Sequence, residues 1–321
     1  MRVLVAGGAG FIGSHLTERL LGDGHEVLVL DNLSTGRLAN LASLRANPRL
    51  TFLECDIVAP LPGLPRVDQV YQLASPASPP GYKRYPLETL RVNSEGTLHL
   101  LEKAQADRAG FLLASTSEAY GDPLEHPQRE DYRGNVSSTG PRSMYDEGKR
   151  YAEALTMVFA RDRGVDARVV RIFNTYGPRS DPFDGRLVPN FVRQALSGEA
   201  MTVYGDGAQT RSLCYVSDLV EGLVRAMGCW SCTGEVMNLG NPEEHTILEF
   251  ASLIRVLAGS TSQLTFVEPA VGDDPQRRQP AIEKANRMLG WMPQVGLREG
   301  LDRTIEWFRS ELRLPALANA R

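Results

Sequence analysis

The chain has 321 residues, of which 42% are hydrophobic and 23% charged, with a formal net charge of −4 at pH 7. This composition is that of an ordinary globular protein, and it argues against disordered and fibrous classes. The negative net charge argues against a general nucleic-acid-binding protein, so any phosphate site must be local.

The sequence also argues against a membrane protein. No apolar run approaches the roughly 20 residues that a spanning helix needs. The chain starts at Arg2 with a short strand-like run rather than with the apolar core of a signal peptide. We therefore expect no membrane partner and a cytoplasmic location.

Four cysteines are too few and too scattered for a disulfide scaffold. Cys229 and Cys232 form a C-x-x-C motif, but no second ligand pair for zinc follows it. The motif trails a predicted helix, whereas a redox motif is expected to open one. We interpret this stretch as a structural loop, and we expect no metal site.

Short β-branched runs alternate with amphipathic stretches in the first half of the chain. We predict strands at 3–6, 27–30, 51–53, 67–73, 111–114 and 168–172, with helices at 12–21, 87–106 and 145–161. Continuously apolar strands separated by helices predict a parallel sheet buried on both faces, with right-handed crossovers. The predicted fold class is α/β, with a doubly wound Rossmann sheet.

The pattern changes after residue 172, where glycine and proline cluster at 177–182. Small strands are expected at 202–204 and 264–266, and helices at 247–257 and 301–312. We predict a nucleotide-binding domain at 1–172, a smaller C-terminal α/β substrate domain at 173–312 and a loose tail at 313–321. The segment 213–228 is expected to pack back on the first domain.

A glycine-rich turn, GGAGFIG at 7–13, joins the first strand to the first helix. Glycines let the pyrophosphate of a dinucleotide approach the backbone, and the helix directs unpaired N–H groups at it. Asp31 ends the second strand, where its carboxylate can accept hydrogen bonds from the adenosine ribose. A 2′-phosphate would be repelled there, so the pattern predicts NAD rather than NADP.

Tyr145 and Lys149 lie four residues apart and therefore share one face of a predicted helix. The lysine ammonium and the positive charge of the nicotinamide would bring the phenol pKa from about 10 toward neutrality. Tyr145 would then take a proton from a sugar hydroxyl while hydride leaves the same carbon. Thr116 follows the fifth strand, at the carboxyl end where ligands bind, so its hydroxyl would hydrogen-bond the reacting oxygen.

With these motifs together, the chain resembles the extended short-chain dehydrogenase/reductases over nearly its whole length. Several stretches are similar to the UDP-glucuronate decarboxylases within that family: 73–80, 116–118, 140–142, 145–150, 171–175, 238–245 and 274–280. The resemblance implies a redox-neutral cycle in which bound NAD oxidises UDP-glucuronate at C4. The resulting β-keto acid would lose CO2, and return of the hydride would give UDP-xylose. A nucleotide-sugar 4,6-dehydratase or 4-epimerase of the same family is the alternative.

The resemblance also implies roles for three further residues. Ser117 takes the place of an aspartate that acts as the acid in 4,6-dehydratases, which argues against loss of water. Glu118 is implied in proton handling at C5 or in positioning water, and Arg278 in orienting the sugar carboxylate. Simple 4-epimerases would need neither. Glu118 as a supporting partner and Arg278 as a surface charge remain the alternatives.

Contacts to the cofactor and the substrate follow from the same resemblance. The implied cofactor contacts are Gly7, Gly10, Phe11, Ile12, Gly13, Asp31, Asn32, Thr35, Gly36, Asp56, Ile57, Leu73, Ser75, Ala114, Tyr145, Lys149 and Thr175. The implied substrate contacts are Tyr82, Arg91, Asn174, Arg186, Val188, Tyr204, Gln209, Arg211 and Arg278. Among these, an arginine suits the diphosphate because its planar fork donates two hydrogen bonds, and Tyr204 would cover the uridine.

The predicted helices at 87–106 and 145–161 carry apolar residues on more than one face. Family members pair such helices across a two-fold axis into a four-helix bundle, so the resemblance implies a homodimer. The alternative is that the sheet and loops of one subunit cover these faces. A non-catalytic NAD-sensing protein is the other rival, but it would have no need to keep Tyr145, Lys149, Thr116 and Glu118 together.

Overall fold

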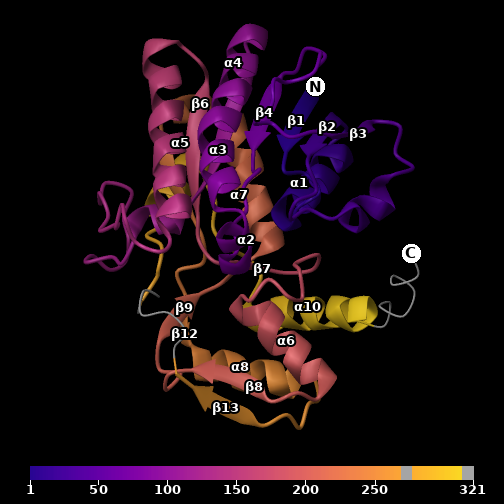
Figure 1. The fold of residues 1–321 in the computed structure, drawn as a ribbon, viewed down its shortest axis with the longest axis vertical. Helices are drawn as coiled ribbons and strands as arrows, with labels where there is room; N and C mark the ends of the chain where they lie inside the picture. Colours follow the sequence, from indigo (N-terminus) through magenta and orange to yellow (C-terminus); the bar gives the residue numbers. More distant parts are fainter. Residues whose placement is uncertain (269–276, 313–321) are drawn as a thin grey trace.

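The centre of the molecule is a seven-stranded sheet in which all neighbouring strands are parallel (Figure 1). A computed structural model describes residues 1–268 and 277–312. The tail predicted at 313–321 and residues 274–276 of the stretch 274–280 lie outside these residues. The strand order β11-β6-β5-β4-β1-β2-β3 reverses direction at β1. The predicted doubly wound α/β fold is confirmed.

Six of the seven strands coincide with predicted ones, and β11 is an addition at one edge. The strands are β1 (Arg2–Ala6), β2 (Glu26–Asp31), β3 (Leu50–Glu54), β4 (Gln69–Gln72), β5 (Gly110–Thr116), β6 (Ala167–Ile172) and β11 (Val236–Leu239). The register of β11 pairs Val236 with Val169 and Leu239 with Ile172. The sheet therefore takes a strand from far beyond residue 172, although the predicted division into two domains remains a prediction.

Helices cover both faces of the sheet. On one face lie α1 (Phe11–Gly22) and α7 (Val216–Gly228), and on the other α4 (Thr97–Asp107) and α5 (Ser143–Asp162). Alternate residues of β1 enter opposite cores, Val3 and Val5 on the α1 side and Leu4 and Ala6 on the α4 side. Burial on both faces explains why these strands are apolar at every position.

The helix predicted at 87–106 is present but divided into three parts. α3 (Pro86–Arg91) leads into a π-helical turn, η2 (Val92–Gly96), and then into α4. Asn93, in the π turn, donates hydrogen bonds to the hydroxyl of Ser75 at 3.0 Å and to the carbonyl of Thr89 at 2.8 Å. The irregular turn thus connects this helix to the segment that follows β4, which continues into the short α2 (Pro79–Arg84).

The C-terminal part lies beyond the carboxyl edge of the sheet (Figure 1). It contains α6 (Leu187–Ser197), α8 (Ile247–Leu257) and α10 (Leu297–Leu312), of which the last begins earlier than predicted. Three two-stranded pieces accompany them: β7 (Thr175–Tyr176) with β10 (Cys214–Tyr215), β9 (Thr210–Ser212) with β12 (Glu244–Thr246), and β8 (Met201–Tyr204) with β13 (Leu264–Val267). The two strands predicted at 202–204 and 264–266 therefore pair with each other.

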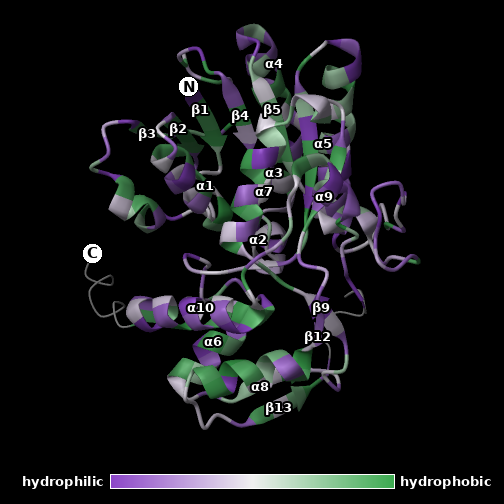
Figure 2. Ribbon diagram, turned by 180° about the vertical axis from the view of Figure 1, so that it is seen from behind, coloured by the Kyte–Doolittle hydropathy of each residue, from purple (hydrophilic) through white to green (hydrophobic). Residues whose placement is uncertain are grey.

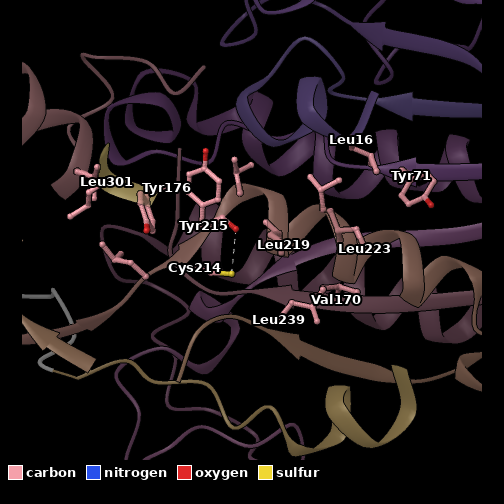
Figure 3. Close-up of a cluster of buried hydrophobic side chains, with 14 of the residues drawn as sticks. Leu16, Tyr71, Val170, Tyr176, Cys214, Tyr215, Leu219, Leu223, Leu239 and Leu301 are labelled. Atoms are coloured by element: carbon pink, nitrogen blue, oxygen red, sulfur yellow. Dashed lines mark hydrogen bonds between the residues drawn. The ribbon is translucent and has the colours of Figure 1, made fainter. Parts of the chain in front are cut away.

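One hydrophobic core joins this part to the sheet. In Figure 3, buried side chains pass from Leu16 and Val170 through Leu219 on α7 to Tyr215 and Leu301. The outer helices are amphipathic, and Figure 2 shows hydrophilic and hydrophobic residues alternating along α8 and α10. Among the described residues no helix is long and apolar enough to cross a membrane.

The C-x-x-C stretch is not the loop that the sequence suggested. Cys229 and Cys232 form a disulfide across a 3₁₀ turn, η4 (Trp230–Cys232), directly after α7. Their Cα atoms lie 5.3 Å apart, so the helical turn itself brings the sulfur atoms together. The remaining short elements are η1 (Leu38–Leu44), η3 (Ser117–Tyr120) and α9 (Glu283–Leu289).

Candidate active site

The glycine turn between β1 and α1 is closed tightly on itself. Gly7 has φ +80°, and its N–H donates to the carbonyl of Leu30 at 2.8 Å. A Cβ on Gly13 would collide with the carbonyl oxygen of Gly7, so this helix position requires glycine. Gly10 caps α1, and among the described residues no side chain caps its first turn. The first N–H groups of α1, at Phe11 and Ile12, are therefore available to an anion.

Asp31 lies at the end of β2, next to this turn. Its carboxylate accepts hydrogen bonds from the backbone N–H groups of Ala9 and Leu33, both at 2.9 Å. Burial raises the pKa of Asp31, and these two hydrogen bonds oppose that rise. Asp31 thus ties the glycine turn to the loop after β2, a role that its strand-end position did not indicate.

The other predicted cofactor contacts lie mainly in loops that follow strands. Asn32 donates to the carboxylate of Asp56 at 3.3 Å, which connects the loops after β2 and β3. Thr35 and Gly36 follow Asp31, and a Cβ on Gly36 would lie 2.7 Å from its carboxylate oxygen. The loop positions are Asp56 and Ile57 after β3, and Leu73 and Ser75 after β4, while Thr175 lies in β7.

Tyr145 and Lys149 lie on α5 and face the end of β5. The Lys149 ammonium donates to the carbonyl of Ala114 at 2.9 Å. Tyr145 is hydrogen-bonded through its hydroxyl to Thr116, and its ring stacks on that of Tyr82 with centroids 5.2 Å apart. The backbone N–H of Glu118 donates to the Thr116 hydroxyl at 3.2 Å. The helix and the strand end therefore bring together Tyr145, Lys149, Thr116 and Tyr82.

The pKa of Tyr145 does not move in the expected direction under the influence of the described residues. Burial raises the pKa of Tyr145 to about 12, and the Thr116 hydrogen bond and the Arg186 charge offset only part of that rise. Burial also lowers the pKa of Lys149 to about 8. Removal from water disfavours the phenolate more than these partners favour it. The expected contribution of the nicotinamide charge remains a prediction.

Glu118 is held between two arginines. The Arg278 guanidinium contacts both carboxylate oxygens of Glu118, with one N···O distance of 3.0 Å, and Arg142 contacts one of them. Burial alone would raise the pKa of Glu118, but the charges of Arg278 and Arg142 bring it down to about 2. Glu118 is therefore ionised at neutral pH. Arg278 is only 5% exposed, so the alternative of a surface charge is wrong.

The chain segment that carries Arg278 is fixed by contacts distant in sequence. The backbone of Gln128 accepts from Ala281 and donates to Gln279, both at 2.9 Å. The Asn238 side chain donates to the carbonyls of Gln128 at 3.0 Å and Ala281 at 3.3 Å. A cavity of 270 Å³ borders Glu118 and Arg142, and its other lining residues lie between 121 and 146.

Arg142 is a site residue to which sequence reasoning assigned no role. Arg142 lies directly before α5, where it is the N-cap residue, and reaches Glu118 across the turn. Its place three positions before Tyr145 was the signal that could have found it, since residues three apart share a helix face.

The predicted substrate contacts divide into two groups. Arg186 donates to the carbonyl of Ala77 at 2.6 Å, and its charge acts on Tyr145, so α6 and the loop after β4 meet at the site. Val188 is buried on α6, and Asn174 lies between β6 and β7. Farther along the chain, Gln209 donates to the carbonyl of Tyr204 at 2.8 Å, and Arg211 lies opposite His245 in the β9–β12 pair.

Arg91 is the exception among these residues. Its side chain is 58% exposed at the end of α3 and forms two hydrogen bonds with Glu95, one turn further on. The helix thus supplies a near partner for Arg91, and its predicted contact with the substrate remains a prediction.

The parallel sheet, the glycine turn and the Tyr145–Lys149 pair define a short-chain dehydrogenase/reductase with a dinucleotide site. The model of the NAD dependent epimerase/dehydratase family matches residues 3–240, and the chain belongs to that family.

Individual relatives narrow this assignment. The chain is 54% identical to UDP-glucuronic acid decarboxylase 1 of Danio rerio, over 97% of this chain and 73% of that protein. It is 50% identical to UDP-glucuronic acid decarboxylase 3 of Arabidopsis thaliana, over 98% and 91%. Among solved structures, UDP-glucose 4-epimerase of Thermotoga maritima with UDP-glucose has a TM-score of 0.89 at 34% identity, covering 97% and 100%. UDP-glucuronic acid 4-epimerase of Bacillus cereus with UDP-glucuronic acid and NAD has a TM-score of 0.86 at 29% identity, covering 97% and 100%. Identity is thus higher to these decarboxylases than to these epimerases.

Proposed function

We propose that this chain is a UDP-glucuronate decarboxylase that converts UDP-glucuronate into UDP-xylose and CO2. The observation that carries the proposal is the convergence of Thr116, Tyr145, Glu118 and Arg278 at the carboxyl end of β5. Ser117, rather than an acid, stands between two of these residues. The named decarboxylases, identical to this chain at about half of the aligned positions, support the same activity.

The residues around the glycine turn fit NAD. A Cβ at Gly7 would collide with the backbone of Leu73 and Ala74, and a Cβ at Gly13 with the carbonyl oxygen of Gly7, so these glycines keep the turn closed. The N-terminus of α1 then offers N–H donors to a pyrophosphate. Asp31 would receive the adenosine ribose, and Lys149 the ribose of the nicotinamide. NAD held there would accept a hydride from C4 of the sugar and later return it.

Tyr145 and Thr116 would hold the C4 oxygen between their hydroxyl groups. Loss of the C4 hydroxyl proton to Tyr145, with departure of the hydride, leaves a ketone β to the C5 carboxylate. Such an acid loses CO2 readily because the new carbonyl stabilises the resulting enolate. The charge on Lys149 would favour the phenolate of Tyr145, which burial disfavours.

Protonation at C5 must follow the loss of CO2. With its pKa near 2, Glu118 holds no proton of its own at neutral pH. This supports positioning of water rather than direct proton donation as the role of Glu118. Arg278 and Arg142 place two positive charges beside it, and Arg278 would orient the sugar carboxylate.

For the UDP group we propose Arg186 and Arg211 as diphosphate partners and Tyr204 as the cover of the uridine. Tyr204 is 46% exposed at the end of β8, which leaves its ring open to a ligand. In this proposal, residues 1–172 supply most of the cofactor site and 173–312 most of the nucleotide-sugar site.

We further propose a homodimer built on α3, α4 and α5. Exposed apolar side chains on α3 and α5 support it: Leu87 at 69%, Leu90 at 40%, Tyr151 at 55% and Val158 at 38%. Burial of such side chains against a second copy would stabilise a four-helix bundle. The cytoplasmic location also stays a prediction.

Incubation of the purified chain with UDP-glucuronate and catalytic NAD tests the proposed activity, with the nucleotide sugar followed by mass spectrometry. We expect loss of CO2 to give a UDP-pentose without net reduction of NAD. An unchanged mass with an inverted C4 centre would instead identify an epimerase. UDP-glucose and dTDP-glucose serve as parallel substrates, and loss of water from either would identify a dehydratase.

A further inference from the structure

The helix that carries Tyr145 and Lys149 also carries a buried carboxylate that the proposed mechanism does not use. Glu153 is 8% exposed. One of its oxygens accepts from the Ser115 hydroxyl at 2.5 Å and from Arg171 at 2.9 Å, and the other accepts from Arg171 at 2.7 Å. Burial of a charge is costly unless the charge is paired and hydrogen-bonded, and these three donors stabilise the ionised Glu153 carboxylate.

Glu153 lies one turn beyond Lys149, on the same face of α5. Lys149 is 3% exposed, and the hydrogen bond of its ammonium goes to the neutral carbonyl of Ala114. Burial lowers the pKa of Lys149 to about 8, and the charge of Glu153 acts in the opposite direction. Glu153 is thus the charged group that opposes the effect of burial on the Lys149 ammonium.

The charged groups on neighbouring elements are less suited than Glu153 to act as the counter-charge of the Lys149 ammonium. Arg171 on β6 is positive and would oppose the ammonium. Glu118 in η3 is bound by two arginines, Arg278 and Arg142, whereas Arg171 is the one arginine among the described residues that pairs with Glu153. On the α3–η2 side, Arg91 and Glu95 pair with each other at the surface. Glu130, in the loop before α5, accepts from the backbone N–H of Asn238 at 2.9 Å.

We propose that Glu153 is a positioning residue for the reaction, serving as the counter-charge of Lys149 and fixing the end of β5 against α5 through Ser115. The inference rests on the proposed function, in which Lys149 acts beside Tyr145. Ser115 stands between Ala114, which binds the Lys149 ammonium, and Thr116, which binds Tyr145. One carboxylate thus holds both sides of the Tyr145–Thr116 contact in place.

The same network reaches the segment that carries Arg278. The Arg171 guanidinium lies 4.6 Å from the centroid of the Tyr120 ring, and the Tyr120 hydroxyl donates to Asn238 at 2.7 Å. Asn238 in turn donates to the carbonyl of Ala281 at 3.3 Å. Glu153 is therefore connected, through Arg171, to both halves of the site.

Titration of Lys149 by NMR tests the counter-charge directly and without turnover. The chain has four lysines, Lys83, Lys103, Lys149 and Lys284. Labelling lysine with ¹³C at Cε gives one signal for each, and arginine at the other three positions assigns Lys149. We expect a wild-type midpoint near 8 and a lower midpoint in Glu153→Gln. A midpoint that falls by about one pH unit corresponds to a tenfold loss of the ammonium form at high pH.

Three variants separate this role from a structural one. Arg171→Gln removes the positive partner of Glu153, so it should raise the titration midpoint of Lys149, whereas Glu153→Gln should lower it. Damage to packing would instead shift the midpoint in the same direction in these two variants. Glu153→Asp keeps the charge and should restore most of the wild-type midpoint. Glu147→Gln, a charge removed from the more exposed side of α5, should change nothing.

A Lys149 midpoint that is unchanged in Glu153→Gln would overturn the inference. If Glu153→Gln fails to fold, Arg171→Gln provides the test. An unchanged or lowered Lys149 midpoint in Arg171→Gln would also overturn the inference. In the decarboxylation assay, Glu153→Gln should lose activity mainly on the alkaline side of its pH profile. A wild-type chain that does not turn over UDP-glucuronate would refute the proposed function, while the titration still tests the counter-charge.

Discussion

Tyr145 and Glu118 belong to one site, yet their surroundings shift their pKa values in opposite directions. Burial raises the pKa of Tyr145 to about 12, so the phenol keeps its proton. At Glu118 burial acts in the same direction, but the charges of Arg278 and Arg142 outweigh it and bring the pKa to about 2. The difference comes from the neighbouring charges rather than from depth of burial.

Tyr145→Phe tests the proton step. The substitution removes the hydroxyl and keeps the ring that stacks on Tyr82. We expect turnover of UDP-glucuronate to fall by about 10² to 10⁴, the usual contribution of a general acid–base group. The measurement is UDP-pentose formation, with circular dichroism as the check on folding. Tyr151→Phe, an exposed tyrosine on the same helix, should be unaffected; a Tyr145→Phe rate above a tenth of wild type would contradict the assignment.

The Glu118–Arg278 pair predicts non-additive effects on stability. Arg278→Ala removes the guanidinium that contacts both oxygens of the buried Glu118 carboxylate and leaves only the contact with Arg142. Breaking a buried pair in this way typically destabilises a protein by about 3–5 kcal/mol. Glu118→Gln added to Arg278→Ala should restore part of the loss in urea unfolding. Additive free energies in the double-mutant cycle would show that the two groups are not coupled. Arg278→Ala should also impair CO2 release.

His15 on α1 predicts a pH dependence of folding. Its Nε2 lies 2.9 Å from the carbonyl of Pro178, and burial lowers the pKa of His15 to about 4. The unfolded chain, with a histidine pKa near 6.5, then binds more protons between these values. Stability should be full above pH 6.5 and fall toward pH 4, by up to about 1.4 kcal/mol per pH unit. Urea unfolding of His15→Gln should show a shallower acid slope; an identical slope would reject this explanation.

At the scale of elements, the spacing of apolar residues predicted well whether a segment is a helix or a strand, but it did not predict irregular turns. The strands of the sheet read as continuous apolar runs because each is buried on both faces. The π turn at η2 was not predicted from the sequence, in which residues 87–106 were interpreted as one helix. Its consequence is tertiary, since it presents Asn93 to Ser75 in the segment after β4.

The Cys229–Cys232 disulfide predicts a small and local effect. It closes a loop of sequence separation three, so its removal releases little chain entropy. The disulfide follows α7 near the amino end of β6, where the Met227 carbonyl accepts a hydrogen bond from Arg168 at 2.8 Å. The candidate site lies at the opposite edge of the sheet, at the carboxyl ends of the strands. Cys229→Ser with Cys232→Ser should lower the melting temperature by only a few degrees and leave UDP-glucuronate turnover unchanged. Loss of turnover would show that the turn affects the distant site.

At the scale of the whole molecule, the two parts share a core rather than a flexible hinge. The buried cluster in Figure 3 runs from Tyr71 in the sheet through Leu223 on α7 to Tyr176 and Leu301. We expect a continuous apolar core to make the two parts unfold together. The site residues that they contribute are thereby held at fixed positions.

The proposed dimer is tested by charge on its predicted interface. Leu90→Glu combined with Tyr151→Glu places carboxylates on α3 and α5, where the two copies would meet. We expect wild type to elute as a dimer and the variant as a monomer in size-exclusion chromatography with light scattering. Trp230→Glu, at an 82% exposed position, is the control and should remain dimeric. A monomeric wild type would contradict the proposal.

Local sequence was sufficient to predict the sheet, the glycine turn and the Tyr145–Lys149 helix, because each depends on periodicity or spacing within a few residues. It did not reveal β11, which pairs with β6 from far along the chain. Tertiary packing was needed to show that Arg142 and Arg278 enclose Glu118, and that Lys149 and Glu153, one turn apart on α5, are both buried. These outcomes depend on burial and on the distance between charges, and neither is a property of local sequence.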